Sequence, residues 1–587
     1  MRYRYKYPSA LFPFARLRLF SALRDRMKEG YSGADFRSDL MAGLVVGMVA
    51  IPLGMALAIA SGVKPEFGLY TVIIAGALVA LLGGSRHQVS GPTAAFVVIL
   101  APIAHKWGFS GLLVAGFMAG LILMLMGLAR MGKFIQFIPH PVTTGFTAGI
   151  GIVIATLQLK DFFGLHPGAL PDDYLPRVAT LIGSYSTFSL REFLIGATTL
   201  ALLLIWPRFN KKIPAPLIAL TTSSVLAAMA TSLIPGFQVA TIGSVFGGIP
   251  QSLPSFQMPW NFTLPGEQPF VLSLQTIEAI FPSAFAIAML GAIESLLSAV
   301  VADGMAQTKH DPDSELIALG VGNVVAPFFG GIAATGAIAR TATNIRFGAT
   351  SPISAVIHAA FALLVVLILA PAVAYLPMAA LSALLLLVAY NMAGIRHVWH
   401  IIKVAPRSDV IVLLLCLGLT VVFDMVVGVT VGVVLAAMLF MRRMAAITSG
   451  HALAESETVQ LKEKLPSDIL LYEIAGPLFF GAAENAMNAV GGITDRVRTV
   501  IFVMEAVPVM DVTGLVALES AIEKLLSQDR YVILAGVKQQ PLELIHKSNL
   551  RTKIEICSTT EQAIMRAKET LLPAAENPPL GATAVVS

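Results

Sequence analysis

The chain has 587 residues, of which 56% are hydrophobic and 13% are charged, and its formal net charge is +5. A soluble domain carries about 25% charged residues, so this composition excludes a wholly water-soluble protein. The small positive charge fits basic anchoring residues beside a membrane, and we expect no nucleic-acid partner. Cys416 and Cys557 lie in an apolar run and a polar tail, which argues against a disulfide framework.

Apolar runs of membrane-spanning length follow one another along the chain. About fourteen segments are predicted, at residues 40–60, 67–83, 89–103, 109–129, 137–158, 190–206, 213–233, 277–302, 312–328, 334–346, 350–371, 374–390, 407–424 and 426–441. The first forty residues are basic and contain no apolar core followed by a small-residue cleavage site. They therefore predict no cleavable secretory signal.

Lys and Arg are distributed unevenly over the turns between these segments. If the N-terminus is cytoplasmic, the inward turns hold Arg86, Arg130, Lys133, Arg208, Lys211, Lys212, Lys309, Arg346, Arg396, Lys403 and Arg407. The outward turns hold few, and the outward stretch 234–275 holds none. This asymmetry predicts an even number of crossings of the inner membrane, with both termini in the cytoplasm.

The pattern changes after about residue 445. The stretches 465–476, 498–507 and 530–537 have the character of buried strands, and 514–528 and 561–572 that of amphipathic helices. This alternation predicts a small α/β domain. We expect four parts: a cytoplasmic segment 1–38, a transmembrane domain 39–444, a soluble domain 455–572 and a disordered tail 573–587.

Two short, interrupted segments occupy matching places in the membrane part. The third segment reads VSGPTAAFVVIL, and the tenth follows APFFGGIAATGAIAR. Broken segments at corresponding positions predict inverted repeats, here about 40–233 and 277–443, with a binding site near the bilayer midplane. The alternative is that these glycines only let helices pack closely.

A broken helix exposes unpaired backbone N–H groups and a partial positive charge at its first turn. Two such ends that face each other can bind an anion without a basic side chain. The predicted lining residues are Gly91, Pro92, Thr93, Ala94, Ala95 and Phe96 from one end, and Thr335, Gly336, Ala337, Ile338, Ala339, Arg340 and Thr341 from the other. Their small side chains would leave the N–H groups accessible, and the three threonines would add hydroxyl donors.

Two ionisable residues lie in apolar surroundings, where such groups are rare and often functional. Arg340 would raise the positive potential at the site, or else snorkel to an interface. Glu294 lies in AIAMLGAIESLLSAVV, where a carboxyl in a low dielectric can change protonation near neutral pH. It is the predicted proton-coupling residue; the alternative is a helix–helix hydrogen bond from a neutral acid. Pro52 interrupts the first segment and would place Met55 at the site, unless Met55 only packs.

Several chemistries have no sequence support. There is no Walker motif, no GxSxG elbow and no Cys/His cluster at metal-ligand spacing. We therefore expect a transporter that is not an enzyme, with no cofactor and no metal. In the tail, Asp511 and Thr513 lie between a strand and a helix. They are either ordinary helix caps or a regulatory loop that docks a cytoplasmic protein partner.

The motifs IPLGMALAIASGVKPEFGLY, GGSRHQVSGPTAAF and GGIAATGAIARTATN, with the helix around Glu294, resemble the sulfate permease family, also called solute carrier 26. DVTG resembles a loop of the STAS domain that ends these chains. The resemblance implies seven-plus-seven inverted repeats in a core and a gate domain, substrate between the third and tenth helices, and a homodimer. Ala339-Arg340-Thr341 matches a Ser-Arg-Ser-like stretch of the family, and Glu294 matches the acidic position of its eighth helix.

One position departs from the family. Many sulfate permeases read Ile-Pro-Gln-Gly-Met in the first helix, where this chain has Leu53 in IPLGM. The motifs IPLGMALAIASGV, GPTAAFVVIL and MLGAIESLL are most similar to a bacterial branch typified by a C4-dicarboxylic acid transporter. The resemblance therefore implies proton-coupled uptake of succinate, fumarate or aspartate by alternating access. The alternatives are a sulfate or bicarbonate carrier coupled to sodium or protons, and an anion channel.

Overall fold

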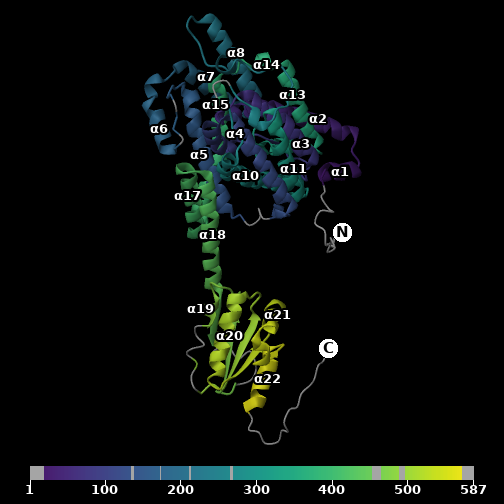
Figure 1. Cartoon of the computed structure of the whole chain (residues 1–587), viewed down its shortest axis with the longest axis vertical. Coiled ribbons are helices and arrows are strands. Elements are labelled where there is room, and N and C mark those ends of the chain that lie inside the picture. Colours follow the sequence, from purple (N-terminus) through teal and green to yellow (C-terminus); the bar gives the residue numbers. More distant parts are fainter. Residues whose placement is uncertain are drawn as a thin grey trace. The chain divides into compact units, whose positions relative to one another are not determined.

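The structure is a computed structural model that describes residues 19–571, except 134–137, 169, 172, 211–212, 265–268, 453–464, 488–492 and 494–495. The predicted tail 573–587 and the predicted domain ends at 455 and 572 lie outside the described residues. The chain divides into two compact units, Met1–Val433 and Val434–Ser587 (Figure 1).

Long apolar helices build the first unit. Within the described residues, nine helical stretches are long and apolar enough to cross a membrane. They are α2 (Gly33–Ala60), α3 (Pro65–Leu82), α4 (Ala94–Leu128), α5 (His140–Phe163), α7 (Leu190–Phe209), α8 (Ala215–Leu233), α10 (Leu274–Ala306), α15 (Met378–Ala393) with α16 (Ile395–Val404), and α18 (Met425–Ile447), which enters the second unit.

Shorter helices complete the set. They are α1 (Ser21–Lys28), α6 (Tyr174–Gly183), α9 (Ile242–Phe246), α11 (Pro312–Val325), α12 (Ile338–Arg346), α13 (Ile353–Ile368), α14 (Ala370–Val373) and α17 (Arg407–Val422). Each of the fourteen predicted segments contains helical residues. The predicted third and fourth segments are continuous in α4, where they meet at a break at Gly108 with φ of 68°.

The helices of the first unit form two groups by their contacts. One group joins α2, α3, α4, α10, α11, α12 and α13, and the other joins α5, α7, α8, α15 and α17. These groups correspond to the expected core and gate. Small residues permit the closest crossings: a Cβ on Gly320 would lie 2.7 Å from the Gly120 oxygen, so α11 packs directly on α4.

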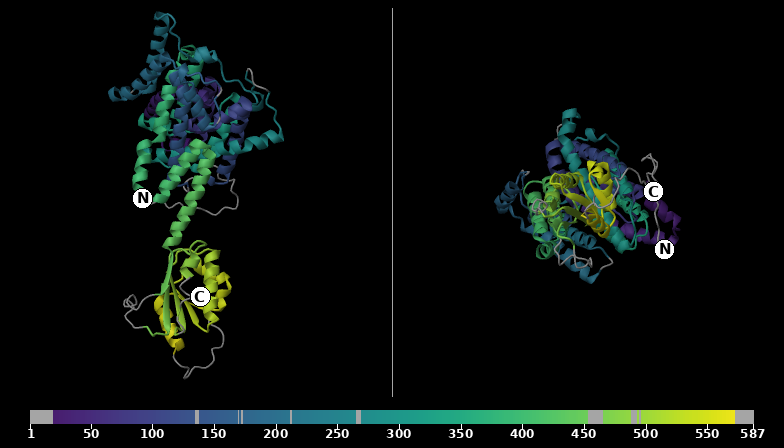
Figure 2. Two further views of the ribbon diagram at one scale, coloured as in Figure 1. Left: turned by 90° about the vertical axis from the view of Figure 1, so that its left-hand side faces the viewer. Right: turned by 90° about the horizontal axis from the view of Figure 1, so that it is seen from below.

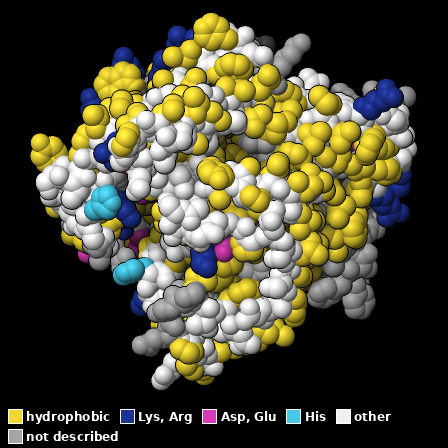
Figure 3. Space-filling view, turned by 90° about the horizontal axis from the view of Figure 1, so that it is seen from above, with side chains coloured by type: hydrophobic (Ala, Val, Ile, Leu, Met, Phe, Trp, Pro, Cys, Tyr) yellow, Lys and Arg dark blue, Asp and Glu magenta, His cyan; other side chains and the backbone are white. Residues whose placement is uncertain are grey.

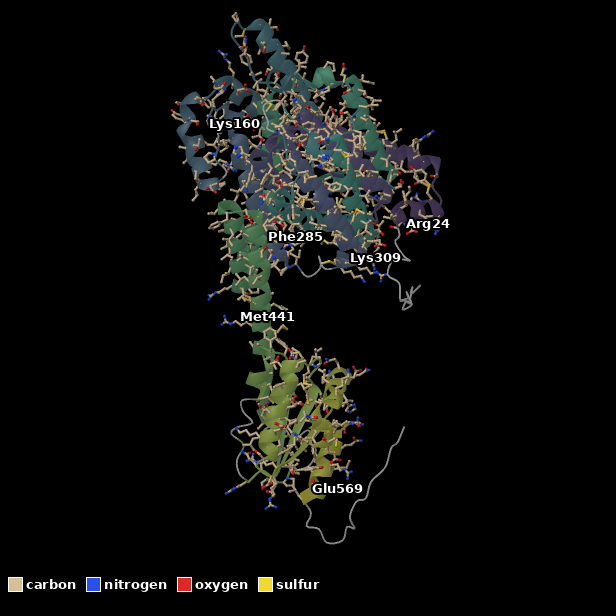
Figure 4. All side chains as sticks on the ribbon, viewed as in Figure 1. Arg24, Lys160, Phe285, Lys309, Met441 and Glu569 are labelled. Atoms are coloured by element: carbon tan, nitrogen blue, oxygen red, sulfur yellow. The ribbon has the colours of Figure 1, made fainter. Side chains whose placement is uncertain are left out.

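The outer surface of the helical unit suits an apolar solvent. Figure 3 looks onto the upper end of this unit and shows many hydrophobic side chains with a few scattered charged ones. Exposed large hydrophobic residues include Leu125, Leu204 and Ile368 on three different helices. Figure 4 shows Lys309, just after the end of α10, at the lower end of this unit and Lys160, in the last turn of α5, in its upper part.

The second unit is an α/β domain. Its sheet has the order β3 (Ser449–Ala452), β4 (Ile469–Ala475), β5 (Thr499–Ala506), β6 (Tyr531–Ala535) and β7 (Glu555–Cys557). β3 is antiparallel to β4, and the other neighbours are parallel. The helices are α19 (Ala483–Met487), α20 (Val512–Leu526), α21 (Gln539–Lys547) and α22 (Thr560–Leu571).

Helices cover both faces of this sheet (Figure 2). Leu518 of α20 and Ile545 of α21 pack with Phe502 on one face, whereas Ile564 of α22 packs with Ile533 on the other. The three predicted strands are confirmed as β4, β5 and β6. The sequence reading missed β3 and β7, because SGHA and EIC are too short and too polar to show a strand pattern.

Candidate functional site

Two very short strands bring the broken segments together in the core. β1 (Ser90–Gly91) pairs antiparallel with β2 (Thr335–Gly336), and all four residues are buried. α4 begins three residues after β1, and α12 begins two residues after β2. The pairing therefore places two helix N-termini close together, which is the arrangement that favours an anion.

Glycines make this crossing possible. A Cβ on Gly91 would lie 2.6 Å from Arg340 Nη1, and a Cβ on Gly336 would lie 2.3 Å from Gln88 Nε2. Any larger residue would push the arginine or the glutamine out of place. The sequences SGPT and TGA thus let each short strand turn into the helix that follows it. Their glycines also leave room for the side chains of Arg340 and Gln88.

Arg340 lies in the first turn of α12 and is 2% exposed. Its Nη2 donates to the Pro92 oxygen, which ties α12 to the segment leading into α4. Its Nε and Nη1 have no hydrogen-bond partner among the described residues. The guanidinium is therefore buried, so it does not snorkel to an interface, and it keeps donors for an anion.

Glu294 joins this arrangement from α10. It is half-buried, and its Oε2 accepts a hydrogen bond of 3.0 Å from Thr93 Oγ1. Thr93 is the N-cap residue of α4, but its side chain does not cap the helix. The contact thus links the predicted coupling carboxyl directly to one of the two helix ends.

The predicted threonine donors have protein partners. Thr335 Oγ1 donates to the Gly291 oxygen at 2.8 Å. Thr341 Oγ1 accepts from the Val89 amide and from Ser298 Oγ, each at 3.1 Å. Together with Thr93, these hydroxyls fasten β2, α12 and the start of α4 to α10. A ligand contact by the backbone N–H groups and Arg340 stays a prediction.

The other predicted lining residues divide by exposure. Ala94, Ala95 and Phe96 are buried in the first turn of α4, whereas Ile338 and Ala339 are exposed in the first turn of α12. Ala337 is the N-cap residue of α12, and its amide donates to the Val89 oxygen at 2.9 Å. Met55 is fully buried in α2. The ligand roles of all these residues stay predictions.

Sequence reasoning missed a supporting layer of buried polar residues. Gln88 Nε2 donates to Ser295 Oγ at 2.5 Å and to Glu315 Oε1 at 2.8 Å. Glu315 Oε2 accepts from the Gly84 and Ser85 amides at 3.0 and 3.1 Å. Asn323 pairs with both backbone groups of Ala334 at 2.8 Å. Only Asn323 gave a signal, as a polar residue isolated in the apolar run LIALGVGNVVAP, whereas Gln88 and Glu315 lie among other polar residues in the sequence.

Asp511 acts as a helix cap in the second unit. Its Oδ1 accepts from the Gly514 amide at 2.8 Å, and its Oδ2 accepts from the Phe480 amide at 3.1 Å. Thr513 is exposed in the first turn of α20. The capping interpretation is therefore seen in the geometry, and the regulatory role of Asp511 and Thr513 stays a prediction.

Two neighbouring helix N-termini beside a buried arginine, inside a bundle of membrane-length helices, are the features expected of a membrane transporter for anions. Residues 36–416 match the sulfate permease family, and residues 461–563 match the STAS domain. The chain belongs to the sulfate permease family and is an anion transporter with a C-terminal STAS domain.

Relatives of known sequence and structure agree with this assignment. The chain is 42% identical to the putative sulfate transporter YvdB of Bacillus subtilis (strain 168), over 90% of this chain and 96% of that protein. It is 30% identical to the bicarbonate transporter BicA of Picosynechococcus, over 89% and 92%. The murine solute carrier 26 member A9 in its inward-facing state shares the fold, with a TM-score of 0.80 over 97% of this chain and all of that chain, at 16% identity. The transmembrane domain of a cyanobacterial BicA matches 69% of this chain and 98% of that domain, with a TM-score of 0.56 and 26% identity.

Proposed function

We propose that this chain is a secondary active carrier that takes up a small oxyanion together with a proton across the inner membrane. The observation that carries this proposal is the 3.0 Å contact between Thr93 Oγ1 and Glu294 Oε2. A charged Glu294 carboxylate competes with an anion for the positive end of α4, whereas a neutral carboxyl does not. Protonation and anion binding are thereby linked, and each favours the other.

The proposed substrate is an inorganic oxyanion, bicarbonate or sulfate. Support comes from the relatives named as bicarbonate and putative sulfate transporters. The C4-dicarboxylate prediction has no support among these relatives. It becomes the second candidate, which rests on Leu53 and the motifs around it.

Alternating access follows from the two helix groups. Both helix ends, Arg340 and Glu294 belong to the core group, so a core that shifts against the gate would carry the whole site with it. We further propose a homodimer with both termini in the cytoplasm, where the STAS domain would meet a protein partner. Flux that saturates and supports counterflow would distinguish this carrier from a channel.

The experiment is uptake into proteoliposomes by the parent and by Glu294→Gln. Bicarbonate, sulfate, succinate, fumarate and aspartate are each offered with a proton gradient, a sodium gradient or neither. We expect one inorganic oxyanion to accumulate with protons in the parent. Glu294→Gln should retain exchange of substrate for substrate and lose proton-driven accumulation.

The matched control is Glu278→Gln, because Glu278 lies on the same helix but is exposed. Its accumulation should equal that of the parent. If Glu294→Gln keeps full proton-driven accumulation, or if only sodium drives uptake, the coupling role of Glu294 is wrong.

A further inference from the structure

α16 is a short helix that packs little against the rest of the first unit. It begins directly after Gly394, whose φ of +51° turns the chain sharply at the end of α15. It ends before Pro406, the N-cap residue of α17. None of its ten residues is buried, and Ile395, Trp399 and Val404 are 60%, 58% and 70% exposed.

The sequence of α16, IRHVWHIIKV, is two-sided. Ile395, Val398, Trp399 and Ile402 recur at the spacing that places residues on one helix face. Arg396, His400 and Lys403 recur at the same spacing along its flank. Lys403 Nζ lies 5.3 Å from the centre of the Trp399 ring. The Lys403 ammonium therefore lies over the face of the Trp399 ring, a cation–π contact that joins the basic flank to the aromatic residue.

α16 itself contains no acidic residue to offset its positive charge. No Asp or Glu occurs between Glu315 and Asp409. Asp409, in the first turn of α17, accepts a hydrogen bond of 3.0 Å from Ser408. Arg407 adds a further cation directly after α16. An open groove of about 360 Å³ runs along the first turn, lined by Tyr390, Asn391, Gly394, Ile395, Arg396 and His397.

The position of α16 indicates what covers its apolar face. α15 and α16 together reach a spanning length, but Gly394 turns the chain between them. α16 therefore leaves the direction of α15 and leads to α17, where the chain turns back at a bilayer surface. A short helix with an aromatic and aliphatic face and a basic flank is suited to the boundary between headgroups and acyl chains. Water on one side and acyl chains on the other satisfy both of its faces.

We infer that α16 is an interfacial helix that binds anionic phospholipid headgroups through Arg396 and Lys403, with Trp399 inserted among the acyl chains. It would anchor the gate group at the bilayer surface. It is joined to that group through the chain at both ends, to α15 and α17, and by the edge-to-face contact between His397 and His140, the first residue of α5, with ring centres 5.3 Å apart. This inference does not depend on which anion is carried.

The test uses the full chain with Trp399 as its single tryptophan, after Trp107, Trp206 and Trp260 are each replaced by Phe. The protein is reconstituted in phosphatidylcholine vesicles that contain a small fraction of either brominated phosphatidylglycerol or brominated phosphatidylcholine. Bromine quenches a tryptophan that it touches. We expect the anionic lipid to quench more strongly, with enrichment of about fivefold for each basic residue near the surface, and high salt to weaken this preference.

Substitutions test whether Arg396 and Lys403 cause the preference for the anionic lipid. Arg396→Gln with Lys403→Gln should reduce the preference for the anionic lipid to near unity and leave quenching by phosphatidylcholine intact. The matched control is Arg24→Gln with Lys28→Gln on α1, which should keep the preference. Size-exclusion profiles and uptake establish that each protein is folded.

Three results would overturn the inference. Equal quenching by both lipids in the parent excludes headgroup selection. No quenching by either lipid places α16 off the bilayer and favours a protein contact. A preference that survives the double glutamine variant assigns the lipid contact to residues other than Arg396 and Lys403.

Discussion

At the scale of single residues, Gly91 is the glycine of the site that lies against Arg340. β1 passes so close to Arg340 that a methyl group on Gly91 would lie 2.6 Å from Nη1. Gly91→Ala should therefore displace the guanidinium from the anion. Loss of one charge-assisted hydrogen bond costs about 1.5–3 kcal/mol, which corresponds to roughly tenfold or more in affinity. Substrate titration of the purified variant measures this loss.

The chain offers a clean comparison for this substitution. Gly418 lies in α17, and no atom is within 4 Å of the position that its Cβ would take. Gly418→Ala should bind and transport like the parent. If Gly91→Ala binds substrate with parental affinity, Arg340 does not contact the anion in the way that the geometry suggests.

The same residues show what could be read from the sequence. Arg340 and Glu294 were predicted because an ionisable side chain in an apolar segment is conspicuous. The hydrogen bond between Thr93 and Glu294 could not be predicted, since 201 residues separate them along the chain. Glu315 was missed because its role depends on Gly84 and Ser85, which only the folded core brings beside it.

At the scale of elements, α1 docks on the core through contacts that should respond to pH. Arg86 donates to both carboxylate oxygens of Glu29, and the Phe20 amide donates to the Leu82 oxygen at 3.0 Å. The hydrogen bond from Arg86 lowers the pKa of Glu29 below its ordinary value of 4.5. A lowered pKa means that this contact stabilises docking above pH 4.5 and is lost as the pH falls through the lowered value.

We therefore predict that α1 is held at neutral pH and released in acid. A spin label at Met27→Cys, in a chain with Cys416 and Cys557 replaced, reports its mobility. The label should become mobile on acidification, and Glu29→Gln should make it more mobile at neutral pH. Arg24→Gln, an exposed change on the same helix, should have no effect. A label that is equally mobile at every pH would show that Glu29 and Arg86 do not hold α1.

Helices could be predicted from the sequence where an apolar run was long enough to cross a membrane. Each of the fourteen predicted segments contains helical residues. α16 was read as part of a charged turn, because ten residues with Arg396, His400 and Lys403 fall short of a spanning segment. Its two-sided pattern marks a helix that lies along an interface, which a search for membrane crossings does not detect.

At the scale of the whole molecule, the sequence predicted that two distant parts of the chain, one in each half of the membrane domain, come together. The third and tenth segments were expected to converge because each is broken by small residues. Antiparallel pairing of Ser90 with Gly336 and of Gly91 with Thr335 shows how they converge. The register of that pairing depends on contacts with α10 and α11, and no local pattern encodes it.

The division into two compact units leads to a last prediction. Both helix ends, Arg340, Glu294 and their supporting residues all lie within Met1–Val433, whereas the STAS domain lies within Val434–Ser587. A chain that ends after Arg443 should therefore keep its substrate affinity, because no residue of the site is removed. Its maximal uptake rate is free to change, since the rate would depend on the proposed movement of the core against the gate and on the proposed assembly of two copies. Substrate titration and initial uptake rates on matched amounts of both proteins separate these effects. A change of more than about tenfold in affinity, which corresponds to 1.4 kcal/mol, would mean that the STAS domain shapes the anion site itself.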